Sequence, residues 1–224
     1  MKVLTSLLVF LLLYSCNTVK KQEQLPPAKN KINVPLSEDS KFPYSKVENT
    51  KTSHAKGFKI TNYGNYKLLE VNNALPKQKH THRYVLVTKE QAMVTTFNRD
   101  VHDAIITIPI ERIAINKIEH NNFLKALNIS NSVVENNALK NSGQLVSNGT
   151  NLIIYSGENG IIKELEHLKK ANIPSIYTGE WNEKSKLAKE EWIKVFAALS
   201  MKEKEANLYL KKNNRFSKKL NGKT

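Results

Sequence analysis

The sequence predicts an α/β fold: a parallel-sheet lobe of the Rossmann-like type, preceded by a β-hairpin and followed by a long connecting helix. Strand-length apolar runs at Asn151–Ser156 and Ile173–Tyr177 alternate with helical patterns, which is typical of βαβ units and a parallel sheet. A glycine-centred turn between two earlier apolar runs predicts the hairpin. The helical pattern that follows Trp181 predicts the connecting helix.

The first residues predict export. After a basic start, Val3–Tyr14 is almost wholly apolar; this is the length of a signal-peptide core and falls short of the roughly 20 residues of a transmembrane helix. Cys16, the only cysteine of the chain, follows at the boundary with the polar region. Residues 1–16 therefore resemble a bacterial lipoprotein signal in which Cys16 is lipidated. An ordinary cleaved signal and an uncleaved anchor are the alternatives. We expect a membrane-anchored protein of the cell envelope that faces the periplasm or the outside.

Residues 17–56 are predicted to form a flexible tether. The segment is rich in Lys, Asn and Ser, has few large apolar side chains, and contains Pro26, Pro27, Pro35 and Pro43. Such a composition cannot bury enough apolar surface to offset the entropy lost on folding. A coil of about 40 residues would average on the order of 35 Å end to end. Packing on the domain is expected, as the alternative, for Phe42–Tyr44 only.

The globular lobe is expected at residues 57–183. Apolar runs at Phe58–Ile60 and Tyr66–Val71 flank Gly64, which supplies the positive φ of a tight turn. The later elements expected, in order, are strands at Arg83–Thr88, Ala104–Ile108 and Arg112–Ile115, a helix at Glu119–Leu127, a strand at Ser132–Glu135 and an irregular stretch from Asn136 to Thr150.

One connecting helix is predicted over residues 184–212, followed by a basic tail at 213–224. Its apolar positions are Trp192, Val195, Phe196, Leu199 and Leu210. The adjacent Glu190 and Glu191 are expected on its solvated face.

The composition excludes several function classes. The formal net charge is +15, but the lysine pairs are spread along the chain without interleaved aromatic residues or a nucleic-acid motif. We expect a solvated lysine-rich surface and no nucleic-acid partner, with attraction to anionic headgroups or an acidic ligand as the alternative. No glycine-rich phosphate loop, nucleophile elbow or Cys/His pair occurs. Neither an enzyme nor a bound cofactor is expected.

Five segments between Ala55 and Leu210 follow one family pattern in order. They are Ala55–Ile60, Ile108–Ala114, His120 with Phe123–Leu127, Ile173-Pro174 and Glu190–Phe196. Together they resemble the ferric-siderophore, haem and cobalamin class of solute-binding lipoproteins (TroA-like, with a helical backbone) that serve ABC importers. The resemblance implies two α/β lobes joined by one long helix, with the ligand between the lobes. It also implies delivery to a permease without catalysis.

Two departures from the family pattern stand out. The family continues with a second lobe after the connecting helix, whereas this sequence has only a polar tail up to Thr224. We therefore expect an N-terminal lobe and a connecting helix whose apolar face is partly bare. The family's permease-docking glutamate motif does not occur between Val134 and Leu152, where Glu135 is the nearest candidate.

The candidate ligand site lies at the carboxyl ends of the predicted parallel strands, where open α/β sheets bind ligands. The side chains there with suitable chemistry are His120, Tyr155, Glu180 and Trp181. His and Glu can pair with a charged chelate or coordinate a metal, whereas Tyr and Trp can cover a flat ligand. Alternatively, His120 is a helix-start histidine satisfied by backbone groups, and Trp181 covers the connecting helix.

A second, weaker pattern is the pair His80 and His82, which share one side of an extended segment, with His102 as a conceivable third ligand. A His-x-His pair alone lacks the ligand count of a metal site, so no metal site is expected.

Three hypotheses remain. The first is a solute-binding lipoprotein that carries an iron siderophore, haem or cobalamin to an ABC permease. The second is a degenerate, truncated relative without a working cleft. The third is a lipid-anchored envelope protein that binds a partner through an exposed helix face.

Overall fold

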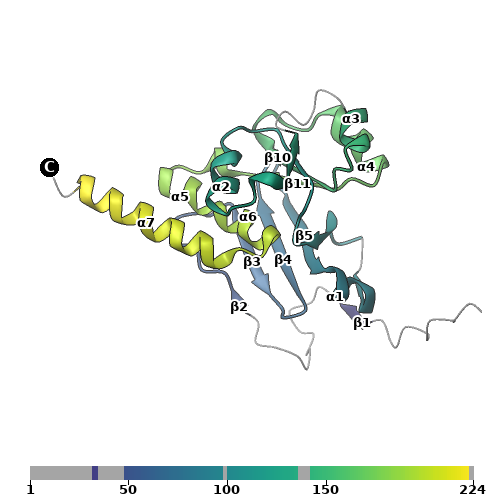
Figure 1. Cartoon of the computed structure of the whole chain (residues 1–224), viewed down its shortest axis with the longest axis horizontal. Coiled ribbons are helices and arrows are strands. Elements are labelled where there is room, and N and C mark those ends of the chain that lie inside the picture. Colours follow the sequence, from purple (N-terminus) through teal and green to yellow (C-terminus); the bar gives the residue numbers. More distant parts are fainter. Residues whose placement is uncertain (1–31, 35–47, 98–99, 136–141, 222–224) are drawn as a thin grey trace, which may run out of the picture.

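The computed structural model describes residues 32–34, 48–97, 100–135 and 142–221, and it shows a mixed α/β fold built on two sheets (Figure 1). The predicted signal with Cys16 and the segment Phe42–Tyr44 lie outside the described residues. Among the helices that the structure describes, none has the length and apolar character needed to cross a bilayer.

The first sheet has five strands in the order β2-β3-β4-β5-β7. Neighbours from β2 to β5 pair antiparallel, whereas β5 and β7 pair parallel. The turn between β3 and β4 contains Gly64, whose φ is 83°. The strands are β2 (Glu48–Asn49), β3 (Phe58–Asn62), β4 (Tyr66–Asn72), β5 (Thr81–Thr88) and β7 (Ala104–Ile108). A separate parallel pair joins β1 (Ile32–Val34) to β6 (Thr95–Phe97).

The second sheet has four strands, all parallel, in the order β11-β10-β8-β9. The chain enters at the inner strand β8, passes to β9 on one side, and returns to β10 and then β11 on the other side. The strand order therefore reverses between β8 and β10. The strands are β8 (Ile113–Ile115), β9 (Val133–Glu135), β10 (Leu152–Ser156) and β11 (Ser175–Thr178).

Helices cover both faces of the parallel sheet, as the alternation of side chains along β10 requires. Leu152 and Ile154 face a core shared with α2 (His120–Ala126) and α6 (Ile193–Ser200). Ile153 and Tyr155 face a second core that contains Leu145 and Leu165. These two side chains come from α3 (Ser142–Ser147) and α4 (Lys163–Lys170), which lie together in Figure 1, away from α6. The remaining short elements are α1 (Lys89–Val94) and the 3-10 turns η1 (Ser130–Ser132), η2 (Gly157–Asn159) and η3 (Glu180–Asn182).

The connecting helix is not a single helix, so that prediction was wrong. The chain forms α5 (Lys186–Glu191), α6 and α7 (Glu203–Asn221), with a break at Trp192 and another at Met201. Met201 is left-handed, with a φ of 58°, and the Lys202 N–H donates to the carbonyl of Ala197. This bond ends α6 and redirects the chain. Helix α7 also includes residues 213–221 of the predicted basic tail.

The expected bare helix face does not exist. Trp192, Val195, Phe196 and Leu199 are fully buried in a core that contains side chains from both sheets. Large apolar side chains of this kind each contribute about 2–3 kcal/mol of burial free energy. In the described part of α7, by contrast, Leu208 is 67% exposed.

The predicted tether and irregular stretch also need correction. Residues 32–34 and 48–49 form strands, and Ala55 is buried, so part of 17–56 belongs to the folded domain. The reason is Glu191, which was expected on a solvated face but is 4% exposed and accepts hydrogen bonds from the backbone of residues 53–55. Within the expected irregular stretch, residues 142–147 form α3, because Leu145 is buried against α4.

Candidate functional site

Polar residues gather where β8, β10 and β11 end. Asn116 directly follows β8, and its side-chain amide forms two hydrogen bonds with the backbone of Ser156, the last residue of β10. Its Oδ1 accepts from the Ser156 N–H at 2.7 Å, and its Nδ2 donates to the Ser156 carbonyl at 3.2 Å. The side-chain amide thereby continues the pairing of the two strands beyond β8, and it holds their carboxyl ends side by side.

His120 and Glu180 form a buried pair behind these strand ends. His120 Nε2 lies 3.1 Å from Glu180 Oε1, and the two residues are 1% and 7% exposed. Burial opposes ionisation of Glu180, but the hydrogen bond and charge of His120 outweigh it and lower the pKa of Glu180 to about 2. The ring of His120 contacts that of Phe196, with centroids 5.0 Å apart. The pair therefore ties the sheet edge to α6.

Lys117 extends this pair toward the surface. Its Nζ lies 3.0 Å from Glu158 Oε2 and 3.6 Å from Glu180 Oε1. Burial lowers the pKa of Lys117, but the hydrogen bond to Glu158 and the charge of Glu180 raise it above its ordinary value. The site thus carries a fixed positive charge between two carboxylates.

Three buried polar atoms at the site have no hydrogen-bond partner among the described residues: His120 Nδ1, Glu180 Oε2 and Ser156 Oγ. Unpaired buried polar atoms are uncommon in native proteins. All three lie near the carboxyl edge of the parallel sheet.

Tyr155 lies on the opposite face of the sheet from His120. Its hydroxyl donates to the Gly160 carbonyl at 2.9 Å, and its ring belongs to the core formed with α3 and α4. The structure thus brings His120 and Glu180 together and places Tyr155 apart from them.

Trp181 covers the sheet edge through the loop that follows β4. Its Nε1 donates to the Ala74 carbonyl at 3.1 Å. Gly157 approaches the same loop so closely that a Cβ there would lie 2.1 Å from Ala74 O. The loop is therefore seated directly on the ends of β10 and β11, and Trp181 lies at its rim.

The described residues form cavities elsewhere, with volumes of about 630, 750 and 390 Å³. None of these three cavities is lined by His120, Tyr155, Glu180 or Trp181. At the sheet edge itself, Ile118 and Ile161 are 72% and 51% exposed and flank the Lys117–Glu158 pair in the chain. The accessible part of this site is thus its rim.

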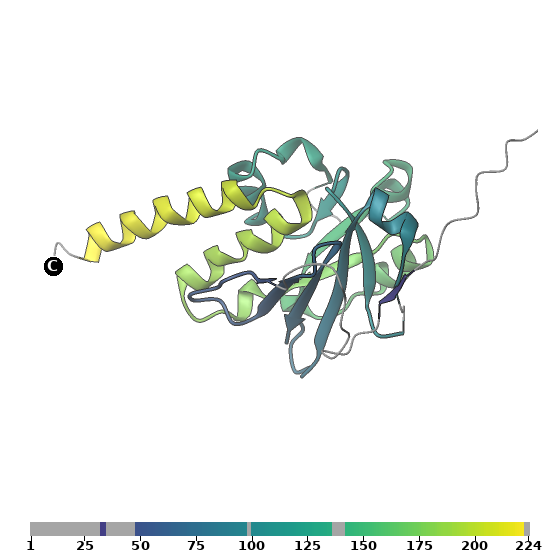
Figure 2. The same cartoon turned by 90° about the horizontal axis from the view of Figure 1, so that it is seen from below.

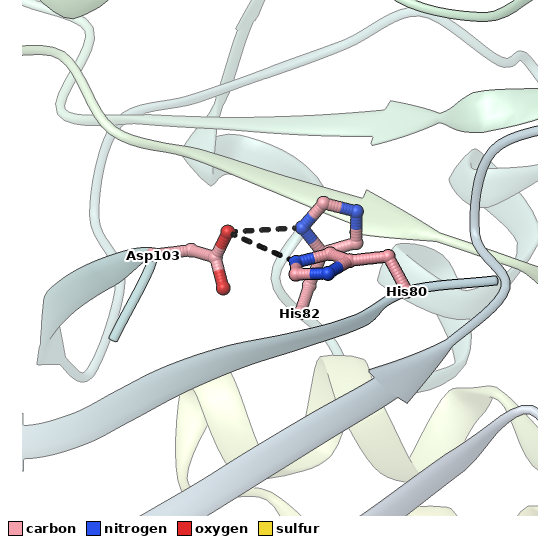
Figure 3. Close-up of side chains that lie close together, drawn as sticks. All are labelled: His80, His82 and Asp103. Carbon is pink, nitrogen blue, oxygen red and sulfur yellow. Dashed lines mark hydrogen bonds and ion pairs between the residues drawn. The ribbon is translucent and has the colours of Figure 1, made fainter. Parts of the chain in front are cut away.

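His80 and His82 do lie together, but their third neighbour is Asp103 (Figure 3). The sequence pattern had suggested His102 as a conceivable third ligand. Asp103 comes close because β5 and β7 pair in parallel, with Tyr84 opposite Ala104, so that Asp103 meets Arg83 one residue earlier. A strand-pairing prediction between Arg83–Thr88 and Ala104–Ile108 would have found it.

Comparison of this chain with models of known protein families, with curated proteins and with solved structures finds no match.

Proposed function

We propose that the protein is a solute-binding lipoprotein, anchored through Cys16, that binds a metal chelate for an ABC importer. The chelate class is ferric siderophore, haem or cobalamin. One observation supports this proposal above all: the strand order of the parallel sheet reverses between β8 and β10. In doubly wound, Rossmann-like sheets, ligands bind outside the carboxyl ends of the strands at such a reversal.

The chemistry at that point suits a chelate. Lys117 offers a cation to the carboxylates of haem or the anionic oxygens of a siderophore, and Glu158 offers a carboxylate to donors on the ligand. Ile118 and Ile161 supply exposed apolar surface for the body of the ligand. Because His120 and Glu180 are buried, we assign them the role of positioning Lys117.

A titration of the full chain tests this proposal. Calorimetry with haem, a ferric siderophore and cobalamin should give saturable one-to-one binding of one of them at micromolar concentration. Lys117→Ala should weaken that binding at least tenfold, because it removes the cation at the rim. Lys186→Ala is the matched control, since its side chain is 90% exposed and lies on α5. Absence of binding to all three ligands by a folded chain would refute the proposal, as would unchanged binding by the Lys117 variant.

One observation favours the alternative, an envelope lipoprotein that binds a partner without transport activity. Helix α7 projects beyond the body of the domain in both views (Figures 1 and 2), and it carries the exposed Leu208. Light scattering over a range of protein concentrations separates the two functions. Self-association that Leu208→Lys abolishes, in a chain that binds no chelate, would establish the alternative.

A further inference from the structure

Three potential metal ligands meet at the start of two paired strands of the five-stranded sheet. His80 precedes β5, His82 is its second residue, and Asp103 directly precedes β7. One ligand atom from each lies within 4.8 Å of the other two. His82 Nδ1 is 3.0 Å and His80 Nε2 is 3.9 Å from Asp103 Oδ1 (Figure 3).

The backbone fixes the carboxylate of Asp103. The Asp103 N–H donates to the Arg83 carbonyl at 2.8 Å, and the Arg83 N–H donates to Asp103 Oδ2 at 2.7 Å. One carboxylate oxygen is thereby held by the strand, while the other, Oδ1, faces the two imidazoles. Outer hydrogen bonds of this kind orient the ligands of metal sites.

Aromatic packing fixes the ring of His82. The side chain is 8% exposed, and its ring lies 4.8 Å from that of Tyr177 between centroids. The ring of His80 meets it edge-on at 4.5 Å and remains 55% exposed. The fold thus holds Asp103 and His82 in place, whereas the exposed His80 side chain can reorient to complete the site.

The spacing matches a small divalent ion. A tetrahedral Zn²⁺ with ligand bonds of about 2.0–2.2 Å requires donor atoms roughly 3.4 Å apart. The distances from His82 Nδ1 and His80 Nε2 to Asp103 Oδ1, 3.0 and 3.9 Å, lie on either side of that value. Imidazole nitrogen with a single carboxylate suits Zn²⁺ and similar first-row ions better than Mg²⁺ or Ca²⁺, which prefer oxygen ligands.

The cluster opens on a cavity of about 750 Å³, to which His80 and Asp103 contribute. Arg83, Lys169 and Asp100 also line this cavity, so its walls carry charges of both signs. Zinc sites with three protein ligands and an open position typically bind water or an exogenous ligand there. The cavity provides room for such a fourth ligand.

We propose that His80, His82 and Asp103 bind one divalent transition-metal ion, with Zn²⁺ as the best fit, through the two imidazole nitrogens and Asp103 Oδ1. This site belongs to the five-stranded sheet, whereas the proposed chelate site lies at the edge of the parallel sheet. The metal-site proposal therefore goes beyond the proposed function, and either proposal can be refuted while the other stands.

The test uses the untagged full chain carrying Cys16→Ser, which removes the only thiol as a competing ligand. After treatment with a chelator, calorimetry and equilibrium dialysis with Zn²⁺ should show one ion per chain. His80→Ala and Asp103→Asn should each weaken binding at least tenfold. His167→Ala, which removes an exposed histidine on α4, should leave the affinity unchanged. Lys117→Ala, which disrupts the chelate site, should leave it unchanged as well.

His80→Ala is the decisive variant, because an exposed side chain can be removed without unfolding the domain; circular dichroism verifies this. Co²⁺ bound in place of Zn²⁺ should give a visible absorption band that this variant lacks. No Zn²⁺ binding at micromolar concentration would overturn the proposal and leave an ordinary Asp–His ion pair. Binding that both ligand variants retain at full affinity would overturn it too.

Discussion

Glu191 anchors the segment that leads into β3. Its carboxylate accepts hydrogen bonds from the backbone N–H groups of Ser53, His54 and Ala55, the last two at 2.7 Å. Burial opposes ionisation of Glu191, but these bonds and the one from Lys194 outweigh it and lower its pKa to about 2. A single side chain thus fixes a segment far away in the sequence.

We expect Glu191→Gln to destabilise the fold by about 2–3 kcal/mol at pH 7, since an amide cannot accept all of these bonds. The pKa is lowered from 4.5 to about 2 on folding, so ionised Glu191 contributes stability in full above pH 4.5. That contribution is lost as the pH falls through about 2. Urea unfolding at several pH values should therefore give a shallower acid loss in the variant than in the parent. Glu190→Gln is the matched control, and an equal effect of both changes would contradict this account.

Residue positions could be predicted only where one sequence rule sufficed. The rule that the carboxyl ends of parallel strands meet at one sheet edge brings His120 and Glu180 together, and the structure places them 3.1 Å apart. Glu191 and Asp103 could not be found in this way. Their partners are backbone groups on other elements, and these meet only through the packing of α5 and the register of β5 with β7.

At the scale of elements, the break between α6 and α7 depends on Met201. This residue is left-handed, with φ 58° and ψ 39°, and its side chain is 49% exposed. A left-handed conformation costs a side chain with a Cβ roughly 1–2 kcal/mol, a cost that glycine avoids. The residue therefore carries backbone strain.

Met201→Gly should accordingly raise the free energy of unfolding by about 0.5–1 kcal/mol, measured by urea denaturation. The greater backbone entropy of glycine in the unfolded chain offsets part of the relief. Met93→Gly provides the matched control, because Met93 is 62% exposed within the regular helix α1. There the same change should cost about 1 kcal/mol. The two substitutions should therefore change the free energy of unfolding in opposite directions. Destabilisation at both positions would refute the proposed strain at Met201.

Apolar runs allowed β5, β7 and β10 to be predicted, and an apolar helix face allowed α2 to be predicted. The helix break was missed because the helical periodicity continues through Met201, whereas α6 ends there at the left-handed conformation of that residue. The short elements α1, β6 and α3 each span fewer than two periods of the helix or strand pattern, so their sequence pattern is weak and tertiary contacts decide their structure.

At the scale of the whole molecule, α6 joins the two sheets into one core. Phe196 is fully buried, and its cluster contains Leu69 of the first sheet and Ile154 of the second. The α/β class was thus predicted correctly, whereas the expected bare apolar face was wrong for α6. The apolar face of α6 is already satisfied within the chain.

This arrangement predicts that the domain unfolds as one unit. Phe196→Ala should lower the free energy of unfolding by about 3–5 kcal/mol, because it leaves a cavity where α6 meets both sheets. Hydrogen exchange should then show equal losses of protection for slowly exchanging amides of β4 and β10, since both depend on the same global opening. Leu208→Ala, at an exposed position of α7, should change either measurement by no more than about 0.5 kcal/mol. If β10 lost protection while β4 kept it, the two sheets would be independent folding units, and α6 would belong to only one of them.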